Sequence, residues 1–352
     1  MKRILMCSSS LKVKGGMVSV VKNYLNYPFW GKDVKIIHVP THIEANKYIL
    51  IFYFAISYTH ILWLALRKKI DIAHLHVAER GSFYRKAFIL QTLKHFKIKV
   101  ILHHHGAEFD LFYNSLSNKK KQYVNKILQK ADLNIVLSQS LVHMIKNKSP
   151  KAKVEVLYNA VNVPQTNPYN LKAHNILFLG RLGQRKGTYD LLQAIKKIDQ
   201  NLSTDVQFYI CGDGEVEEVK STVNRMGISH RIAYIGWIDG AQKKLFMSQS
   251  MINVLPSYNE GLPMTILETM AHGIPNISTS IASIPEVLHD EENGYLIIPG
   301  DINTLCARLL ELSSDINLRK KFSQESYNLI KKSFSLDANI KNLQDIYTKL
   351  IL

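Results

Sequence analysis

Short continuous runs of apolar residues alternate with longer stretches of mixed polarity along the whole chain. Such runs are typical of strands buried on both faces of a parallel sheet, and the stretches between them, among them Lys119–Lys130 and Tyr189–Ile198, predict helices. The alternation predicts an α/β fold with two Rossmann-like, doubly wound parallel sheets, one in each half of the chain. The predicted strands are Arg3–Ser8, Val34–Val39, Ile72–His76, Val100–His104, Leu133–Leu137, Val154–Tyr158, Asn175–Leu179, Val206–Cys211, Ile232–Gly236, Ile252–Leu255, Pro275–Thr279 and Gly294–Ile298.

A polar segment separates the two halves. At 352 residues the chain is longer than one ordinary domain and suits two. Val163–Asn170 has two prolines among polar neighbours and is interpreted as the linker. We therefore expect one domain over residues 1–164, a second over residues 171–336, and a helix over residues 337–352.

The segment Ile49–Leu66 has no formal charge and is near the lower length limit for a membrane-spanning helix. It contains Ser57, Thr59 and His60, and three basic residues follow it at positions 67–69. We interpret it as a buried or interfacial helix, because a membrane span would interrupt the first α/β domain.

The net charge of +17 lies wholly in the first half of the chain. Residues 1–170 hold 26 Lys/Arg and 8 Asp/Glu, whereas residues 171–352 hold 19 and 20. This asymmetry predicts that the first domain faces an anionic partner, either a membrane surface or nucleic acid. A generally basic proteome would have raised the charge of both halves.

Cysteine usage and the start of the chain favour a cytoplasmic location. Cys7, Cys211 and Cys306 lie far apart and form neither a disulfide framework nor a CxxC metal motif. The first residues run directly into a predicted strand, without the long apolar stretch of a signal peptide.

The strongest candidate site is the segment from Glu260 to Glu268. Pro263 is predicted to open a helix that Gly273 ends. The free N–H groups of the first turn suit a diphosphate, and the two carboxylates flank that position and can accept hydrogen bonds from hydroxyls. A nucleotide sugar has this layout, with ribose and hexose on either side of a diphosphate, but two solvated glutamates would show the same spacing. The donor-site residues predicted here are Glu260, Gly261, Leu262, Pro263, Met264, Thr265 and Glu268.

Three glycine-containing turns follow predicted strands, where ligands bind in such sheets. The turn Gly180–Gly187 contains Arg181 and Lys186, which would supply cations to phosphates, although a basic surface loop would look the same. Gly212 and Asp213 lie in a second turn, which is a weak signal alone. In the first half, Gly15 and Gly16 allow close approach of the backbone to a ligand, but match neither GxGxxG nor GxxxxGK[ST].

Three adjacent histidines, His103, His104 and His105, end the strand that begins at Val100. Adjacent side chains on a strand point to opposite faces, so these three are not expected to share a metal ion. A histidine that emerges at the carboxyl end of the strand is placed to touch a sugar, and we expect at least two of the three to pack in the core.

Together these motifs resemble the retaining glycosyltransferases of family four, which have the GT-B fold of two Rossmann-like domains facing a cleft. The resemblance covers nearly the whole chain and rests on the E-x7-E pair, the Arg181–Lys186 turn, Gly212–Glu215 and the Gly15–Gly16 turn. The segments around His76–Lys86 and His103–Phe109 are similar to the subgroup that assembles bacterial capsule, O-antigen and exopolysaccharide.

The resemblance implies a role for each site residue. Glu260 would hold hydroxyls of the donor hexose and Glu268 the ribose, while Arg181 and Lys186 neutralise the leaving diphosphate. His105 matches the family histidine near the reaction centre, with His103 as the runner-up. The resemblance further implies a nucleotide-sugar donor, a UDP-sugar by family frequency with a GDP-sugar left open. It also implies no metal or other cofactor, a saccharide or polyprenyl-diphosphate-linked acceptor, a peripheral location at the inner membrane face, and a C-terminal helix that returns to the first domain.

Two other functions remain open from the sequence. One is a nucleotide-sugar epimerase or hydrolase on the same fold. The other is a nucleic-acid-binding protein, against which the basic residues are scattered and no nucleic-acid-binding motif is present. The chain contains no Asp-x-Asp sequence, so a metal-dependent sugar transferase of the other common design is unsupported.

Overall fold

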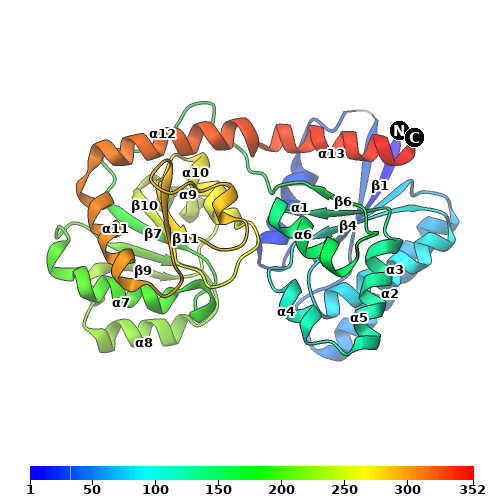
Figure 1. Ribbon diagram of the computed structural model, residues 1–352, viewed down its shortest axis with the longest axis horizontal. Helices are drawn as coiled ribbons and strands as arrows, with labels where there is room; N and C mark the ends of the chain where they lie inside the picture. Colours follow the sequence, from blue (N-terminus) through cyan, green and yellow to red (C-terminus); the bar gives the residue numbers. More distant parts are fainter. Residues whose placement is uncertain (32) are drawn as a thin grey trace. The chain divides into compact units, whose positions relative to one another are not determined.

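A computed structural model describes residues 1–31 and 33–352, and the chain divides into two compact units (Figure 1). The first unit comprises Met1–Ala160 and Leu336–Leu352, and the second comprises Val161–Ser335. All twelve predicted strands are present, with ends that differ by at most two residues from those expected.

The first unit is a six-stranded sheet in the order β2-β1-β3-β4-β5-β6, and every neighbouring pair is parallel. Its apolar core includes Leu5, Leu75 and Leu102 from the strands and Phe83 and Leu90 from α3. The strands are β1 Lys2–Ser8, β2 Val34–Pro40, β3 Ile72–Val77, β4 Lys99–His104, β5 Leu133–Val136 and β6 Val154–Val156. The helices are α1 Gly16–Asn26, α2 Lys47–Leu66, α3 Gly81–His95, α4 Phe109–Asn114, α5 Asn118–Lys130, α6 Gln139–Lys148 and α13 Leu336–Ile351.

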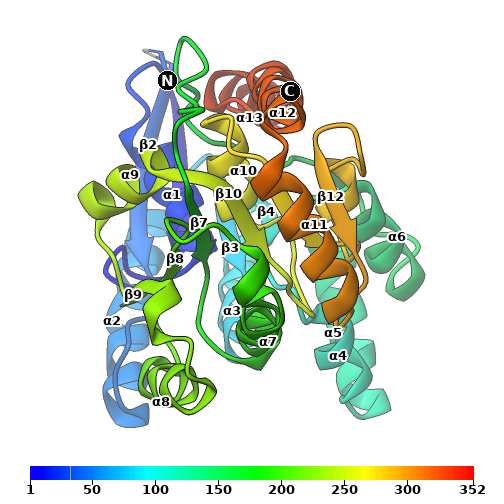
Figure 2. The same cartoon turned by 90° about the vertical axis from the view of Figure 1, so that its left-hand side faces the viewer.

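The second unit is also a six-stranded parallel sheet, in the order β12-β11-β10-β7-β8-β9. Helices α7 and α11 pack side by side in this unit (Figure 2). The strands are β7 Asn175–Leu179, β8 Phe208–Cys211, β9 Ile232–Gly236, β10 Ser250–Leu255, β11 Asn276–Thr279 and β12 Gly294–Ile297. The helices are α7 Thr188–Ile198, α8 Val216–Met226, α9 Gly240–Ser248, α10 Met264–Ala271, α11 Ile302–Ser314 and α12 Ile316–Ser333.

Each sheet reverses its strand order once, between β1 and β3 in the first unit and between β7 and β10 in the second. At such a point the loops that leave two neighbouring strands diverge, which opens a crevice at the carboxyl ends of the strands. The turns Gly180–Gly187 and Pro256–Glu260 flank the reversal point of the second sheet, so the topology places both motifs where ligands bind.

The prediction of a linker at Val163–Asn170 is wrong. The chain passes from the first unit to the second at Ala160–Val161, and residues 163–170 pack on the second unit. The Tyr169 hydroxyl donates to the Met251 carbonyl at 2.8 Å, and the Asn167 amide donates to the Ser323 hydroxyl at 3.0 Å. Prolines and polar side chains therefore mark an extended segment here, but not a free one.

Helix α2 forms the crossover between β2 and β3, so Ile49–Leu66 is a helix of the first α/β unit, as expected for a buried or interfacial helix. It is the one helix among the described residues long and apolar enough to cross a membrane by length and composition alone, and 22% of its most apolar window is buried. Only Ser57, Ile61, Leu64 and Ala65 are buried on this helix, so most of its apolar surface faces outward.

The charge asymmetry follows the division into units. The first unit holds 28 Lys/Arg and 10 Asp/Glu, a net of +18, because residues 336–352 add two of each to the 26 and 8 of residues 1–160. The second unit holds the remaining 17 and 18, a net of −1.

Candidate functional site

Two loops meet beside the reversal point of the second sheet. The Tyr258 backbone N–H donates to the Arg185 carbonyl at 2.9 Å, and the Arg185 guanidinium donates to the Asn259 carbonyl at 3.2 Å. Gly187 has φ of +69°, and a Cβ atom there would overlap the Pro256 carbonyl. A glycine is therefore required where the two loops touch, and their contact fixes the positions of Lys186 and Glu260.

Lys186 and Glu260 form a buried ion pair at the contact between these loops. The Glu260 carboxylate accepts from the Lys186 ammonium and from the Ser257 hydroxyl, the latter at 2.8 Å. The exposed fractions of the two charged side chains are 14% for Lys186 and 6% for Glu260. Burial lowers the pKa of Lys186, and the Glu260 carboxylate opposes that shift. The sequence predicted a cation for phosphate at Lys186; the structure shows that its charge is already shared with Glu260.

Helix α10 presents the second glutamate. Pro263 caps this helix in an extended conformation and Met264 is its first residue, so the predicted helix start at Pro263 is wrong by one position. The chain leaves the helix through His272 and then Gly273, which has φ of +66°. Glu268 lies on the second turn, partly buried, and both its oxygens accept from the Lys243 ammonium at 2.9 Å.

The glycine turns after β7 and β8 are hydrogen-bonded to each other. The Leu182 N–H donates to the Asp213 carbonyl at 2.6 Å, and a Cβ atom at Gly212 would overlap the Gly180 carbonyl. Arg181 is an exposed cation in this pair of turns, and its guanidinium lies 3.7 Å from the Asp213 carboxylate. Arg181 is therefore free to turn toward a ligand, unlike Lys186.

The remaining predicted site residues divide between the two units. Leu262 and Met264 are buried and Gly261 and Thr265 are partly buried at the start of α10. Gly15 and Gly16 are exposed in the first unit, where Gly15 caps α1 with φ of +138° and Gly16 is the first helical residue. No side chain crowds Gly15, so its backbone is open to a ligand.

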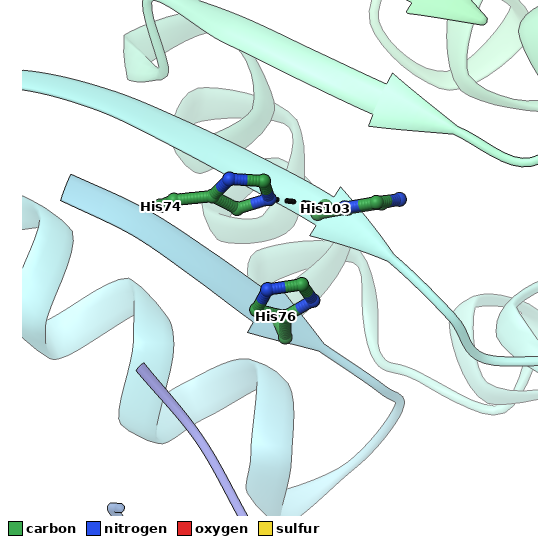
Figure 3. A group of neighbouring side chains, drawn as sticks. All are labelled: His74, His76 and His103. Carbon is green, nitrogen blue, oxygen red and sulfur yellow. Dashed lines mark hydrogen bonds between the residues drawn. The ribbon is translucent and has the colours of Figure 1, made fainter. Parts of the chain in front are cut away.

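Four histidines from two neighbouring strands of the first unit stack on one another. His74 and His76 lie on β3, and His103 and His105 lie on and after β4. His74 bonds through Nε2 to His103 Nδ1 at 3.0 Å (Figure 3). His76 Nδ1 bonds to His105 Nε2 at 2.8 Å. The Tyr347 hydroxyl of α13 is 2.7 Å from His74 Nδ1. The hydrogen bonds therefore form two groups, Tyr347–His74–His103 and His76–His105, and the second includes the residue that directly follows β4.

Burial keeps these imidazoles neutral. It lowers the pKa of His74 and of His105 to about 3, and it lowers the pKa values of His76 and His103 well below the ordinary range. Repulsion between the neighbouring imidazoles adds to the shift for all but His74. A neutral His105 can accept or donate one hydrogen bond at the nitrogen not used by His76, which suits contact with a sugar hydroxyl.

The expectation that the three adjacent histidines do not converge holds for His103 and His104, which bond to different partners. His104 Nε2 is 3.1 Å from the Asn134 side-chain oxygen, away from the stack. Strand pairing nevertheless brings nitrogens of His74, His76 and His103 within 4.8 Å of one another, close enough for a metal ion to be considered. Within the described residues both nitrogens of His74 already have partners, and Nε2 of His76 and of His103 have none. The absence of a metal stays a prediction.

Three contributors to these clusters escaped the sequence-based prediction. Ser257 lies just after the predicted strand Ile252–Leu255, and its position three residues before Glu260 could have suggested a loop hydrogen bond. Lys243 is 25 residues from Glu268, and Tyr347 is 273 residues from His74. No local sequence pattern predicts either contact.

Comparison with known proteins agrees with this fold. One family model, described as Glycosyltransferase Family 4, matches residues 20–165, and another, described as Glycosyl transferases group 1, matches residues 162–329. Fold and site thus define a two-domain glycosyltransferase with two Rossmann-like sheets. The chain belongs to the family-four type, of the kind that builds bacterial surface polysaccharides.

Three curated relatives place the chain among polysaccharide genes and enzymes. It is 28% identical over 248 residues to an uncharacterized 41.2 kDa protein in the cps region of Klebsiella pneumoniae, with 67% of each chain covered. It is 25% identical to an α-1,3-galactosyltransferase of Escherichia coli that uses UDP-Gal and α-D-GlcNAc-diphosphoundecaprenol, with 82% and 78% covered. It is 26% identical to the amylovoran biosynthesis glycosyltransferase AmsK of Erwinia amylovora, with 69% and 61% covered.

Solved structures confirm the fold. Sucrose-phosphate synthase from Thermosynechococcus elongatus superposes with a TM-score of 0.80 at 17% identity, covering 99% of each chain. Anabaena Alr3699/HepE in complex with UDP gives 0.76 at 15% identity, covering 99% of this chain and all of that one. The two family models, not these structures, favour a glycosyltransferase over the epimerase and nucleic-acid alternatives.

Proposed function

We propose that the protein transfers a hexose from a UDP-sugar, with retention of configuration, to a saccharide or polyprenyl-diphosphate-linked acceptor in bacterial surface-polysaccharide assembly. The observation that carries this proposal is the buried Lys186–Glu260–Ser257 cluster beside α10, with Glu268 one turn further on. The Escherichia coli relative, whose name includes UDP-Gal and a diphosphoundecaprenol acceptor, supports the choice of substrates.

The donor would lie along the start of α10. Glu260, held by two donors, keeps acceptor capacity for a hexose hydroxyl, because a carboxylate has about four lone-pair sites. Glu268 has the same spare capacity for the ribose hydroxyls beside its bonds to Lys243. We propose that the diphosphate is bound by the exposed Arg181 and by the free N–H groups at the start of α10. The nearby positive charge of Lys186 adds to this attraction.

In the proposed reaction the bond between the anomeric carbon and the diphosphate oxygen breaks, and its electron pair leaves with the diphosphate. The acceptor oxygen then bonds to the anomeric carbon from the same face, and its proton passes to the departing diphosphate. Arg181 and Lys186 stabilise the negative charge that develops on the leaving group, so no metal ion is required by this scheme. His105 is proposed to contact the transferred sugar through its free nitrogen.

Binding and turnover test this proposal directly. Calorimetric titration with UDP, GDP and their hexose derivatives should show one-to-one binding of UDP and its sugar, with GDP much weaker. Turnover of the bound sugar should need an added acceptor, and NMR of the product should show the anomeric configuration of the donor. Rapid donor turnover without acceptor would indicate the hydrolase or epimerase instead, and an inverted product would refute retention.

The role of Glu268 has its own matched control. A hydrogen bond to a charged group is worth about 1.5–3 kcal/mol, so Glu268→Ala should weaken UDP binding about tenfold to a hundredfold. Glu325→Ala removes an exposed glutamate of α12 in the same unit and should leave UDP affinity unchanged. Equal UDP affinity in both variants would remove Glu268 from the site.

We also propose peripheral binding to an anionic membrane through α2. Ile51, Phe52, Ile56 and Trp63 are each more than half exposed on this helix, and basic residues follow it at positions 67–69. An apolar face beside basic residues on a unit of net charge +18 is the pattern of a helix that lies in the membrane interface.

Co-sedimentation with lipid vesicles tests this surface. The protein should bind vesicles that contain phosphatidylglycerol and not vesicles of phosphatidylcholine alone. The double variant Phe52→Ser and Ile56→Ser should lose most of this binding, whereas Leu245→Ser, a change of an exposed leucine in the second unit, should keep it. Unchanged binding of the double variant would show that α2 is not the contact.

A further inference from the structure

The first unit contains a lysine that is buried without an acidic partner. Lys86 on α3 is 1% exposed, and its ammonium donates to the Thr41 hydroxyl at 2.6 Å. No carboxylate forms an ion pair with it within the described residues. An ammonium has three N–H donors, and a buried charge without a counter-ion costs several kcal/mol. An anion bound beside Lys86 would supply the missing counter-ion.

Two more basic side chains adjoin Lys86, and each has a buried nitrogen without a partner. These atoms are Nε of Arg85 and Nδ1 of His42. Burial lowers the pKa of His42, and the positive charges of Arg85 and Lys86 lower it further, against the opposing effect of the exposed Glu44. Burial also lowers the pKa of Lys86 to about 8, so its ammonium stays protonated at neutral pH. Three basic groups therefore gather with unfilled hydrogen-bonding capacity.

These groups lie where the topology favours a ligand. Thr41 directly follows β2, and its N–H donates to the carbonyl of Ser8, the last residue of β1, at 2.8 Å. Arg85 and Lys86 lie in the second turn of α3, the helix that follows β3. The site thus lies at the carboxyl ends of the strands that surround the reversal point of this sheet.

The exposed apolar helix α2 lies beside the same strand end. The Ser57 hydroxyl on α2 donates to the Pro40 carbonyl, one residue before Thr41, at 2.7 Å. Tyr58 on α2 packs against the half-exposed Phe88 on α3, with ring centroids 4.8 Å apart. An anion held by Lys86 would therefore have apolar surface next to it, which suits an amphiphile with a phosphorylated head.

We propose that Lys86, Arg85 and His42 bind the diphosphate of a lipid-linked saccharide acceptor, whose hydrocarbon chain lies along α2. This inference rests on the proposed transferase function and adds to it the residues that select the acceptor. These residues belong to the first unit, whereas Glu260 and Glu268 of the proposed nucleotide site belong to the second.

Calorimetric titration with farnesyl diphosphate tests the site in the full chain, with saturating UDP present to fill the donor site. Wild-type protein should bind one farnesyl diphosphate, and inorganic pyrophosphate and farnesol should each bind much more weakly. Lys86→Met, which keeps the length of the side chain and removes its charge, should weaken binding at least tenfold. Arg85→Gln should weaken it severalfold, and it provides the test if the Lys86 variant fails to fold.

The control is Lys126→Met, which removes an exposed lysine of α5 in the same unit and should leave binding unchanged. Affinity for UDP should be the same in all three variants. Equal binding of farnesyl diphosphate by wild-type protein and both site variants, or equal binding of farnesol and farnesyl diphosphate, would overturn the inference. Binding of UDP without any binding of farnesyl diphosphate would overturn it while leaving the donor site intact. Farnesyl diphosphate binding that depends on Lys86 in a protein that fails to bind UDP would support the anion site and contradict the proposed donor.

Discussion

The buried pair of Lys186 and Glu260 allows a quantitative prediction for Glu260→Gln. The substitution keeps the shape of the side chain and an acceptor for the Ser257 hydroxyl, but leaves the Lys186 charge without a counter-ion. Breaking a buried ion pair on one side costs about 3–5 kcal/mol. The alternative is loss of the lysine proton: from an ordinary pKa of about 10.4 to pH 7, at about 1.4 kcal/mol per unit, this costs about 4.6 kcal/mol. Both routes give the same size of effect.

Urea unfolding at several pH values distinguishes this cause from general damage. If folded Glu260→Gln protein holds Lys186 neutral, the unfolded chain binds one more proton, so the free energy of unfolding rises by about 1.4 kcal/mol per pH unit. The deficit relative to wild type should therefore shrink from about 4–5 kcal/mol at pH 7 to about 2 kcal/mol at pH 9.

The double variant Lys186→Met with Glu260→Gln is the control, since it removes both charges and keeps the volume. Replacing a buried pair by groups of similar shape is often neutral, so its stability should return to within about 1.5 kcal/mol of wild type. A Glu260→Gln variant within about 0.5 kcal/mol of wild type at pH 7, or a deficit that does not change with pH, would refute the reasoning.

Two further predictions concern acid stability and backbone packing. Burial lowers the pKa values of His74 and His104 to about 3 and about 4, below the ordinary 6.5, so their contribution to stability is complete above pH 6.5 and is lost as the pH falls toward the folded values. The free energy of unfolding measured with urea should therefore fall between pH 6.5 and pH 5, by about 1.4 kcal/mol per pH unit for each of these histidines. A free energy of unfolding that does not change over this range would contradict their burial as neutral groups. Gly212→Ala should lower the melting temperature sharply because its Cβ would overlap a backbone carbonyl, whereas Gly240→Ala, which meets no atom within 4 Å, should be neutral or gain up to about 1 kcal/mol. Equal melting temperatures for the two glycine variants would show that the close approach at Gly212 can relax.

The strands and the class of fold were predictable from sequence because each buried parallel strand is a local apolar run. Asn175–Leu179 has that run, is buried throughout and lies where expected. The segment Val163–Asn170 misled because proline and polar residues describe an extended backbone and do not say what it packs on. Pro263 misled by one position, since a proline suits either the cap or the first residue of a helix.

The residues of the candidate site could be predicted from the sequence, but which of their charged side chains contact one another could not. Glu260, Glu268, Arg181 and Lys186 all lie at strand ends or on the following helix, as local patterns indicated. Which charges meet depends on loop contacts between distant segments, so the neutralisation of Lys186 by Glu260 could not be foreseen. The same holds for Lys86, whose lack of an acid partner is a property of the packed unit.

The hydrogen bond between Tyr347 and His74 has a consequence for how the chain is made. Helix α13 belongs to the first unit, so that unit draws on residues from both ends of the described sequence. During synthesis the first sheet emerges from the ribosome long before α13. At that stage His74 has no hydrogen bond to the Tyr347 hydroxyl. The second unit can complete its core earlier, because all of its residues precede α13. A helix translated after the whole second unit therefore completes the first unit, whose packing stays incomplete until α13 has been made.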